Sequence, residues 1–158
     1  MTTRSAVLAA AARLIEKEGI AGLSVREAAR RAGVSHNAPY RHFRDRDSLL
    51  AGLAEEGRAL LEKALQGRSG RELGEAYVRF ALAHPQRFRL MFRAGGAQNA
   101  LLERFAAAFE GMSEPRIAGL AAWSLVHGIA ELAIHGCVGA EEVPKILGAM
   151  RFAVQRSA

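Results

Sequence analysis

Apolar residues along this chain recur at intervals of three and four positions, as the buried faces of helices require. Over residues 3–18 this spacing places five apolar side chains on one face. The predicted face consists of Val7, Leu8, Ala11, Leu14 and Ile15. No segment alternates apolar and polar residues over the length of a strand. The pattern therefore predicts an all-α protein.

A second helix is predicted directly after Ser24. Ser24 and Glu27 have the spacing of a capping box, in which each side chain accepts a hydrogen bond from the other residue's backbone N–H. Gly33 can supply the positive φ that often ends a helix, and Ser35 can cap the helix that follows. Two helices joined by a short turn containing glycine are typical of the helix-turn-helix motif, which binds duplex DNA.

Further helices are expected over the rest of the chain. One begins near Asp45 and continues to about residue 65, and Gly67, Ser69 and Gly70 then interrupt the pattern. The helices predicted beyond this interruption cover residues 71–83, 86–93, 97–111, 116–138 and 141–155.

Basic residues are concentrated at the N-terminal end. The 158 residues include 22 Lys and Arg against 16 Asp and Glu, a net charge of +6. Residues 1–47 contain nine basic and five acidic residues (+4), and the remainder contains thirteen and eleven (+2). A phosphate-binding surface requires such an excess, and a solvated basic surface has the same composition.

The remaining composition bounds the class of protein. The single cysteine, Cys137, excludes an internal disulfide and suits a reducing compartment. No apolar run approaches the ~18 residues of a membrane span, and the N-terminus lacks a signal-peptide pattern. A cytoplasmic protein without membrane contact is expected. No catalytic Ser/His/Asp set, Gly-rich phosphate loop or metal-protease motif occurs, so neither an enzyme nor a cofactor is expected.

Residues 4–53 resemble the DNA-binding domain of TetR-family transcriptional regulators. The matching motifs, in order, are EKEGIAGLSV, AARRAGVS, the run Tyr40-Arg41-His42-Phe43, and DRDSLL at the start of the next helix. The resemblance implies a three-helix DNA-binding domain over residues 1–47 and a helical dimerisation and ligand-binding domain over residues 48–158. It also places residues 26–31 on the second helix and residues 36–42 on the recognition helix.

Small polar residues at the start of a recognition helix can enter the major groove. Asn37 could bind an adenine, His36 another base edge, and Ala38 a thymine methyl group, although the polar side chains could equally contact water or phosphate. Tyr40 and His42 resemble the phosphate-contacting pair of the family. The predicted DNA-binding residues are Arg26, Ser35, His36, Asn37, Ala38, Tyr40, Arg41, His42 and Arg46.

Part of the C-terminal region resembles a TetR subgroup with a Trp…His-Gly motif, here Ala122-Trp123 and Val126-His127-Gly128 together with residues 84–92. The resemblance implies a homodimer paired through the last two helices, and a pocket for a small-molecule effector. The small residues of helix 116–138 agree with close pairing, and packing within one chain predicts the same composition. The candidate pocket residues, each of which could equally belong to the core, are Phe88, Met91, Phe92, Phe105, Phe109, Trp123 and His127.

His127, Glu131 and His135 share one helix stripe and raise the possibility of a metal site. Because the stripe spans about 12 Å along the helix, the three side chains cannot all reach one ion without partners from elsewhere. A His–Glu hydrogen bond or a dimer contact is the favoured interpretation, and no metal is predicted.

The sequence as a whole supports the hypothesis of a homodimeric, ligand-responsive TetR-like transcriptional regulator. It would act as a repressor that binds palindromic operator DNA. The alternative is a helical interaction protein whose helix-turn-helix packs without sequence-specific DNA binding.

Overall fold

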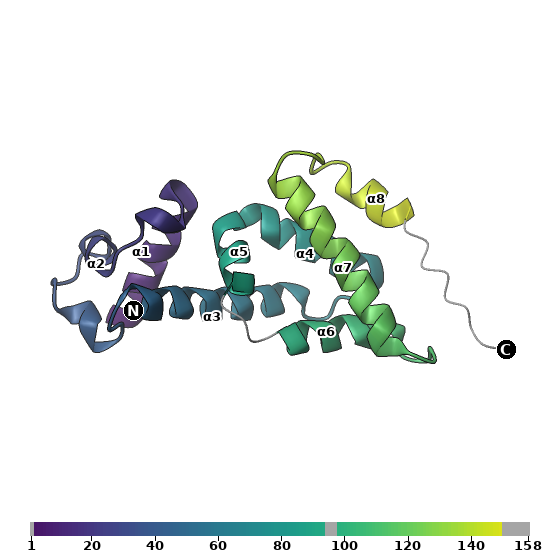
Figure 1. Cartoon of the computed structure of the whole chain (residues 1–158), viewed down its shortest axis with the longest axis horizontal. Helices are drawn as coiled ribbons and strands as arrows, with labels where there is room; N and C mark the ends of the chain where they lie inside the picture. Colours follow the sequence, from purple (N-terminus) through teal and green to yellow (C-terminus); the bar gives the residue numbers. More distant parts are fainter. Residues whose placement is uncertain (1, 94–97, 150–158) are drawn as a thin grey trace. The chain divides into compact units, whose positions relative to one another are not determined.

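A computed structural model describes residues 2–93 and 98–149, and within these ranges the chain contains helices and turns but no strand (Figure 1). The predicted all-α class is therefore confirmed. The α-helices are α1 (Thr3–Glu18), α2 (Val25–Ala32), α3 (Arg46–Leu65), α4 (Gly70–Ala83), α5 (Pro85–Arg93), α6 (Gln98–Ala106), α7 (Pro115–Ile134) and α8 (Val143–Ala149). Three short 3-10 turns are η1 (Ile20–Gly22), η2 (Ala38–Arg41) and η3 (Ala107–Phe109).

The chain folds into two compact units. The first comprises Met1–Ala59 with His84–Gly95, and the second comprises Leu60–Ala83 with Gly96–Ala158. Helix α3 thus contributes to both units, whereas α5, which follows α4 in the chain, packs with the N-terminal helices.

The core of the first unit forms around α1. All five residues of its predicted buried face are at most 2% exposed, so that prediction is confirmed. They pack with Phe43 after η2, with Leu49 and Leu53 of α3, and with Leu90 of α5. A helix from a distant part of the chain therefore completes the core of the N-terminal unit.

Helices α2 and α7 end in the same way. Gly33 follows α2 with φ 68°, as predicted, and Gly136 follows α7 with φ 73°. At α2 the backbone N–H groups of Gly33 and Val34 donate to carbonyls of the last turn, which is a Schellman motif. The same bonds at Gly136 and Cys137 end α7 at Ile134, so the predicted extension of this helix to residue 138 is wrong.

The predicted recognition helix over residues 36–42 is also wrong in its form. The structure has a single 3-10 turn, Ala38–Arg41, in which Tyr40 and His42 donate to carbonyls three residues earlier. Pro39 lacks a backbone N–H and so cannot donate the hydrogen bond that a longer helix would need at this position. Phe43 is 2% exposed and returns the chain to the core after one turn.

Two other predicted boundaries change. The helix expected over 97–111 is α6 followed by η3, which ends at Phe109. The helix expected over 141–155 is α8, Val143–Ala149, and residues 150–155 lie outside the described part of the chain.

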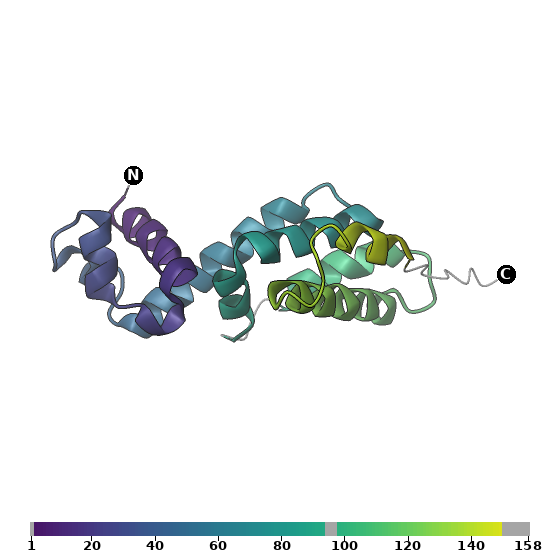
Figure 2. The same cartoon turned by 90° about the horizontal axis from the view of Figure 1, so that it is seen from above.

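In the second unit, α7 lies against α4 and α6, and α8 lies against α4 (Figures 1 and 2). At Gly119 a Cβ atom would lie 2.5 Å from the backbone of Ala106, so only glycine permits this approach of α7 to the end of α6. Contrary to the sequence-based expectation that no apolar run approaches a membrane span, α7 is the one helix in the described ranges that is long and apolar enough to cross a membrane. One such helix is weak evidence, because core helices of soluble proteins also pass this test of length and composition.

Candidate nucleic-acid interface

The turn between α2 and α3 presents a polar surface. Most of the predicted DNA-binding residues are exposed there, namely Ser35, His36, Asn37, Tyr40, Arg41 and His42, and Arg26 is exposed on α2. Ala38 is half-buried, and Pro39 is buried beneath it. The 45% exposure of Tyr40 is high for a large aromatic residue. The structure thus gathers these side chains on one short turn.

The two predicted base-reading residues contact one another. The His36 Nδ1 atom lies 3.1 Å from the Asn37 Oδ1 atom, within hydrogen-bonding distance. The His36 ring also lies 6.0 Å from the Tyr40 ring, measured between centroids. Because both polar groups are exposed, a base edge could replace this local bond without leaving either group buried and unpaired.

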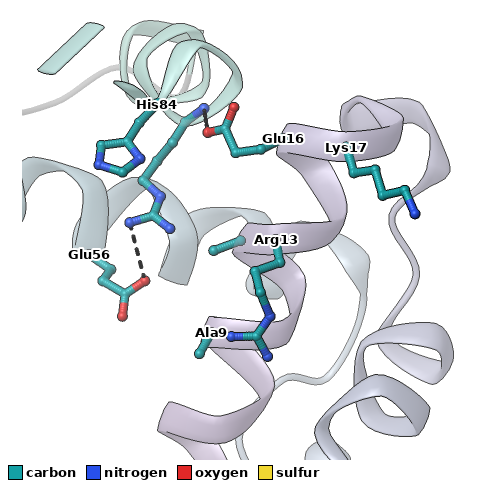
Figure 3. Close-up of a pocket in the computed structure, with 8 residues that line it drawn as sticks. Ala9, Arg13, Glu16, Lys17, Glu56 and His84 are labelled. Atoms are coloured by element: carbon teal, nitrogen blue, oxygen red, sulfur yellow. Dashed lines mark hydrogen bonds and ion pairs between the residues drawn. The ribbon is translucent and has the colours of Figure 1, made fainter. Parts of the chain in front are cut away.

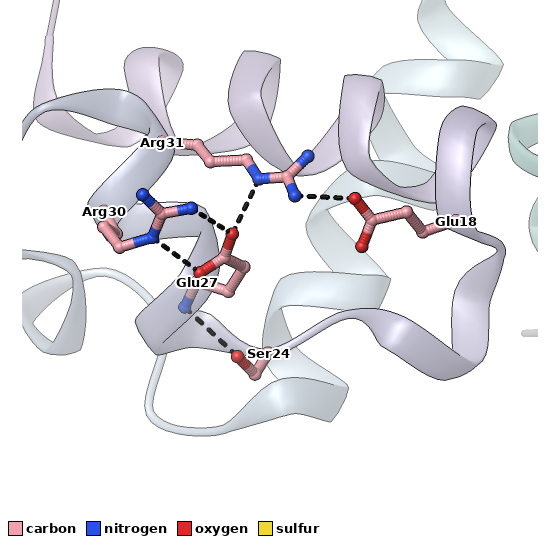
Figure 4. Close-up of polar contacts among 5 residues, drawn as sticks. All are labelled: Glu18, Ser24, Glu27, Arg30 and Arg31. Carbon is pink, nitrogen blue, oxygen red and sulfur yellow. Dashed lines mark hydrogen bonds and ion pairs between the residues drawn. The ribbon is translucent and has the colours of Figure 1, made fainter.

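Arg30 and Arg31 are held by acidic side chains of the same unit (Figure 4). The Glu27 carboxylate accepts hydrogen bonds from both guanidinium groups, and Arg31 also pairs with Glu18 at 2.6 Å. The hydrogen bonds from Arg30 and then Arg31 lower the pKa of Glu27 to about 2. These two arginines are therefore neutralised locally, whereas Arg26 has no ion pair within the described residues.

The capping box is only half formed. The Ser24 hydroxyl accepts from the Glu27 backbone N–H at 3.1 Å, as predicted. The Glu27 carboxylate, however, turns to Arg30 and Arg31 instead of returning to Ser24, because two guanidinium groups offer stronger, charge-assisted bonds. The predicted cap at Ser35 is likewise wrong, since η2 begins after Asn37 without a side-chain cap.

Arg46 has an internal role that the sequence did not reveal. Its guanidinium donates to the carbonyls of Leu23 at 3.0 Å and Ile20 at 2.7 Å, and so ties α3 to the segment before α2. Arg44 differs, since its side chain is 91% exposed and pairs only with the adjacent Asp45 within the described residues.

The start of α3 is capped by a reciprocal pair. Asp45 accepts from the Ser48 backbone N–H at 2.8 Å, and the Ser48 hydroxyl accepts from the Asp45 N–H at 3.0 Å. The Ser48 backbone bond, followed by the Arg44 bond, lowers the pKa of Asp45. The sequence predicted a helix that begins near Asp45 but not the pairing with Ser48.

Helix α5 is anchored to α1 by Glu16 (Figure 3). The Glu16 carboxylate accepts a hydrogen bond from the backbone N–H of Arg87, in the first turn of α5. It accepts a second one from the backbone N–H of Gln86. The Arg87 guanidinium lies 3.9 Å from Glu56 of α3, at the edge of a groove of about 580 Å³. Through these contacts three helices of the first unit meet at one polar cluster.

The residues predicted to form a ligand pocket are divided between the units. Phe88 and Met91 are buried in the first unit, and Phe92 contacts Phe88 edge-to-face with ring centroids 5.1 Å apart. In the second unit, Phe105 and Phe109 line a cavity of about 240 Å³.

Trp123 and His127 converge on Tyr77, a fully buried residue of α4 that the sequence analysis did not single out. The Trp123 Nε1–H donates to the Tyr77 hydroxyl at 3.0 Å, and this hydroxyl lies 2.9 Å from the His127 Nδ1 atom. Burial raises the pKa of Tyr77 and lowers the pKa of His127. A neutral tyrosine thus joins the tryptophan and the histidine of the predicted motif.

His127 and His135 point to different partners. The His135 Nδ1 atom lies 2.7 Å from the Glu131 carbonyl oxygen on its own helix, whereas His127 meets Tyr77. No group of three His, Cys, Asp or Glu side chains in the described ranges could hold a metal ion.

Two family models match the chain and together cover most of it. The model of bacterial regulatory proteins of the tetR family matches residues 7–53, and the model of the tetracyclin repressor-like C-terminal domain matches residues 71–147. The chain belongs to the TetR family. As a TetR-family transcription regulator it carries a helix-turn-helix DNA-binding domain, and the first match coincides with the α1–α3 region described above.

Solved structures of similar proteins support this TetR-family fold. A protein of unknown function from Rhodococcus sp. RHA1 is 36% identical over 94% of this chain and 91% of that chain, with a TM-score of 0.74. A TetR-like transcriptional regulator from the same source is 17% identical, and the match covers 93% of this chain and 92% of that chain with a TM-score of 0.71. SmeT, solved in complex with triclosan, is 19% identical, and the match covers 94% of this chain and 91% of that chain with a TM-score of 0.60.

Proposed function

We propose that this TetR-family protein is a cytoplasmic transcriptional repressor that binds palindromic operator DNA as a homodimer and responds to a small molecule. The observation that carries the proposal is the exposed polar turn after α2, in a chain whose family consists of regulators. Asn37 and His36 would contact bases, with Ala38 beside them. Tyr40, His42, Arg41, Arg26 and Ser35 would contact phosphate groups. Arg46 would support these contacts by holding α3 in place.

Dimer formation is supported by the exposed face of α7. Four large apolar side chains on this helix are between 44% and 59% exposed: Ile117, Leu120, Leu125 and Leu132. Gly128 is exposed on the same helix, and a Cβ atom added there would meet nothing within 4 Å. An apolar helix face with a small residue between its large side chains favours the close approach of a second helix. Two protomers related by a two-fold axis would then present two recognition turns to the two halves of a palindrome.

Residue substitutions can test this pairing directly. Leu125→Glu places a charge in the proposed interface and should yield monomers in sedimentation equilibrium. Leu60→Glu, on α3, is the matched control because Leu60 is also an exposed leucine, at 39%. Dimers that persist with Leu125→Glu would contradict pairing through α7.

The ligand response can be transmitted along the chain from α4 to α5. The first residues of α4 line the 240 Å³ cavity, and α4 ends at Ala83, two residues before α5 begins at Pro85. Glu16 in turn holds the N-terminus of α5 to α1. A ligand that favours one position of α4 would therefore bias α5 and the DNA-binding turn, and by reciprocity operator DNA would weaken binding of the ligand. SmeT, bound to triclosan, is a neighbour in fold that takes a small molecule.

We also infer that the chain belongs to the subgroup with the Trp…His-Gly motif, in which the tryptophan and histidine would be selected by their shared bond to a buried tyrosine, here Tyr77.

Selection from a random duplex DNA library at moderate salt tests the function as a whole. Enrichment of a palindrome would support a dimeric, sequence-specific regulator and would supply the operator. Weak, salt-sensitive binding without enrichment would contradict sequence-specific recognition. Complete absence of binding would favour the alternative, a helical interaction protein.

A further inference from the structure

The cavity of the second unit is small, mostly apolar and partly open to solvent. Its volume is about 240 Å³, and its walls come from α4, α6 with η3, α7 and α8. The side chains that define its interior are Leu73, Phe105, Phe109, Val126 and Leu147. A cavity of ~150 Å³ with a similar lining holds a benzene molecule, so this one has room for an aromatic ring and a short substituent.

Among the described residues that line the cavity, Arg71 is the one that carries a charge. Its Nε atom donates to Glu75 at 2.6 Å, one turn along α4, and its Nη1 atom lies near Gly148 of α8. Within the described part of the chain, the donors on Nη1 and Nη2 have no partner. A guanidinium with two unused Nη groups matches the two oxygens of a carboxylate.

We propose that this cavity binds a compact aromatic monocarboxylate, with the ring in the apolar interior and the carboxylate on Arg71. Phe105 and Phe109 can pack against a ring edge-to-face or offset, which favours an aromatic body over a branched aliphatic one of the same volume. Glu75 does not line the cavity and is already bonded to Arg71, so a cationic ligand has no corresponding partner in the lining. The binding follows from the cavity alone, but the role of the ligand as effector rests on the proposed function.

A matched pair of probes separates shape from charge. Isothermal titration calorimetry of the full-length protein with 3-phenylpropionate is compared with 3-phenylpropanamide, which has the same shape and no charge. Because Arg71 is partly exposed, we expect the acid to bind about three- to tenfold more tightly than the amide. Arg71→Gln, which removes the charge and keeps most of the length, should abolish this difference.

Two alanines of η3 provide a second test that does not depend on charge. Both alanines are exposed, but Ala108 lines the cavity and Ala107, its neighbour, does not. Ala108→Leu should fill the space and abolish binding of both probes. Ala107→Leu adds the same volume outside the cavity and should leave binding unchanged, so a general loss of folding would be detected.

Equal affinity for acid and amide, or full binding by Ala108→Leu, would overturn the proposal, and so would a failure of both probes to bind. These outcomes are distinct from failure of the proposed function. If the ligand-free protein selects a palindrome but binds neither probe, the proposed regulatory function stands and the proposed ligand class is wrong. If the acid binds with the expected pattern but the protein binds no DNA, the proposed ligand class stands and the proposed regulatory function is wrong.

Discussion

Glu16 on α1 holds the N-terminus of α5 through Arg87, whose backbone nitrogen lies 3.1 Å from the Glu16 carboxylate. The Gln86 nitrogen lies 3.0 Å from the same carboxylate, so one side chain satisfies two N–H groups of the first turn. Met91 and Arg87 then pack closely over Gly57 of α3. The DNA-binding unit of this TetR-family protein therefore depends on a helix encoded some 70 residues after α1.

Glu16→Ala should loosen α5 from α1. The loss of an acceptor for two helix N-terminal groups costs about 1 kcal/mol of stability, which urea unfolding can measure. Hydrogen exchange should also become faster at the amides of Gln86 and Arg87. Glu62→Ala is the control, because Glu62 is exposed and has no ion pair among the described residues. Unchanged exchange at the two amides would show that Glu16 does not anchor α5.

The exposed turn should divide into residues that set affinity and a residue that sets specificity. Arg41→Ala should weaken binding to all DNA sequences. It should also reduce the slope of log affinity against log salt concentration by about 1, since one phosphate contact is lost. Tyr40→Phe should weaken binding about fivefold without changing the slope, because its hydroxyl carries no charge. Asn37→Ala should relax discrimination at one base position.

Fluorescence anisotropy with the selected operator, over a range of salt concentrations, measures these effects. Arg79→Ala is the control for lost positive charge, because Arg79 is exposed on α4 in the second unit. A salt slope that falls equally for Arg41→Ala and Arg79→Ala would place the DNA contact elsewhere.

Arg46 and Arg44 lie two positions apart and should behave differently. Arg46→Ala removes two hydrogen bonds to the Leu23 and Ile20 carbonyls, so it should lower the unfolding free energy by about 1 kcal/mol. Arg44→Ala removes an exposed charge and should leave stability unchanged while reducing DNA affinity. Thermal unfolding and DNA titration of both variants provide the comparison, and equal stability of the two would refute the internal role of Arg46.

Acid should weaken the polar cluster around Glu27. Its pKa in the folded protein is about 2, against an ordinary value of 4.5, so the folded state favours the ionised form. This contribution to stability is fully present above about pH 4.5 and is lost as the pH falls toward about 2. Glu27→Gln should therefore reduce the dependence of Tm on pH across this window. Glu62→Gln should not, and parallel curves for wild type and Glu27→Gln would contradict the assignment.

Two glycines of α7 should respond in opposite ways to alanine. Gly119→Ala forces a methyl group against the Ala106 backbone and should destabilise the protein by about 1–3 kcal/mol. The methyl group of Gly128→Ala meets nothing within 4 Å, so this substitution should stabilise α7 within the folded monomer by about 0.5–1 kcal/mol. In the proposed dimer the same methyl group would hinder close pairing, so Gly128→Ala should weaken dimerisation in sedimentation equilibrium while the protein remains folded. Tighter dimers for this variant would argue against Gly128 at the interface.

Local chemistry made much of this protein predictable from its sequence. The helical spacing in α1 predicted five residues that are all buried, although it missed the buried alanines at positions 6, 10 and 12. Gly33 ended α2 with the expected positive φ. The order of motifs around the helix-turn-helix was sufficient to identify the family, because the short segment from Ser24 to Asp47 contains its own caps and turn. These features depend on residues only a few positions apart in the chain, so they can be predicted from the sequence alone.

The tertiary structure decided what depends on distant partners. The sequence predicted a helix over residues 86–93, but it could not show that Leu90 packs into the core of the first unit or that Glu16 caps this helix. Arg46 was predicted to contact DNA, and the sequence could not show that it also donates to two carbonyls from the segment before α2. A polar or apolar side chain has the same chemistry in either role, and only the packing of segments far apart in the chain determines which partner it meets.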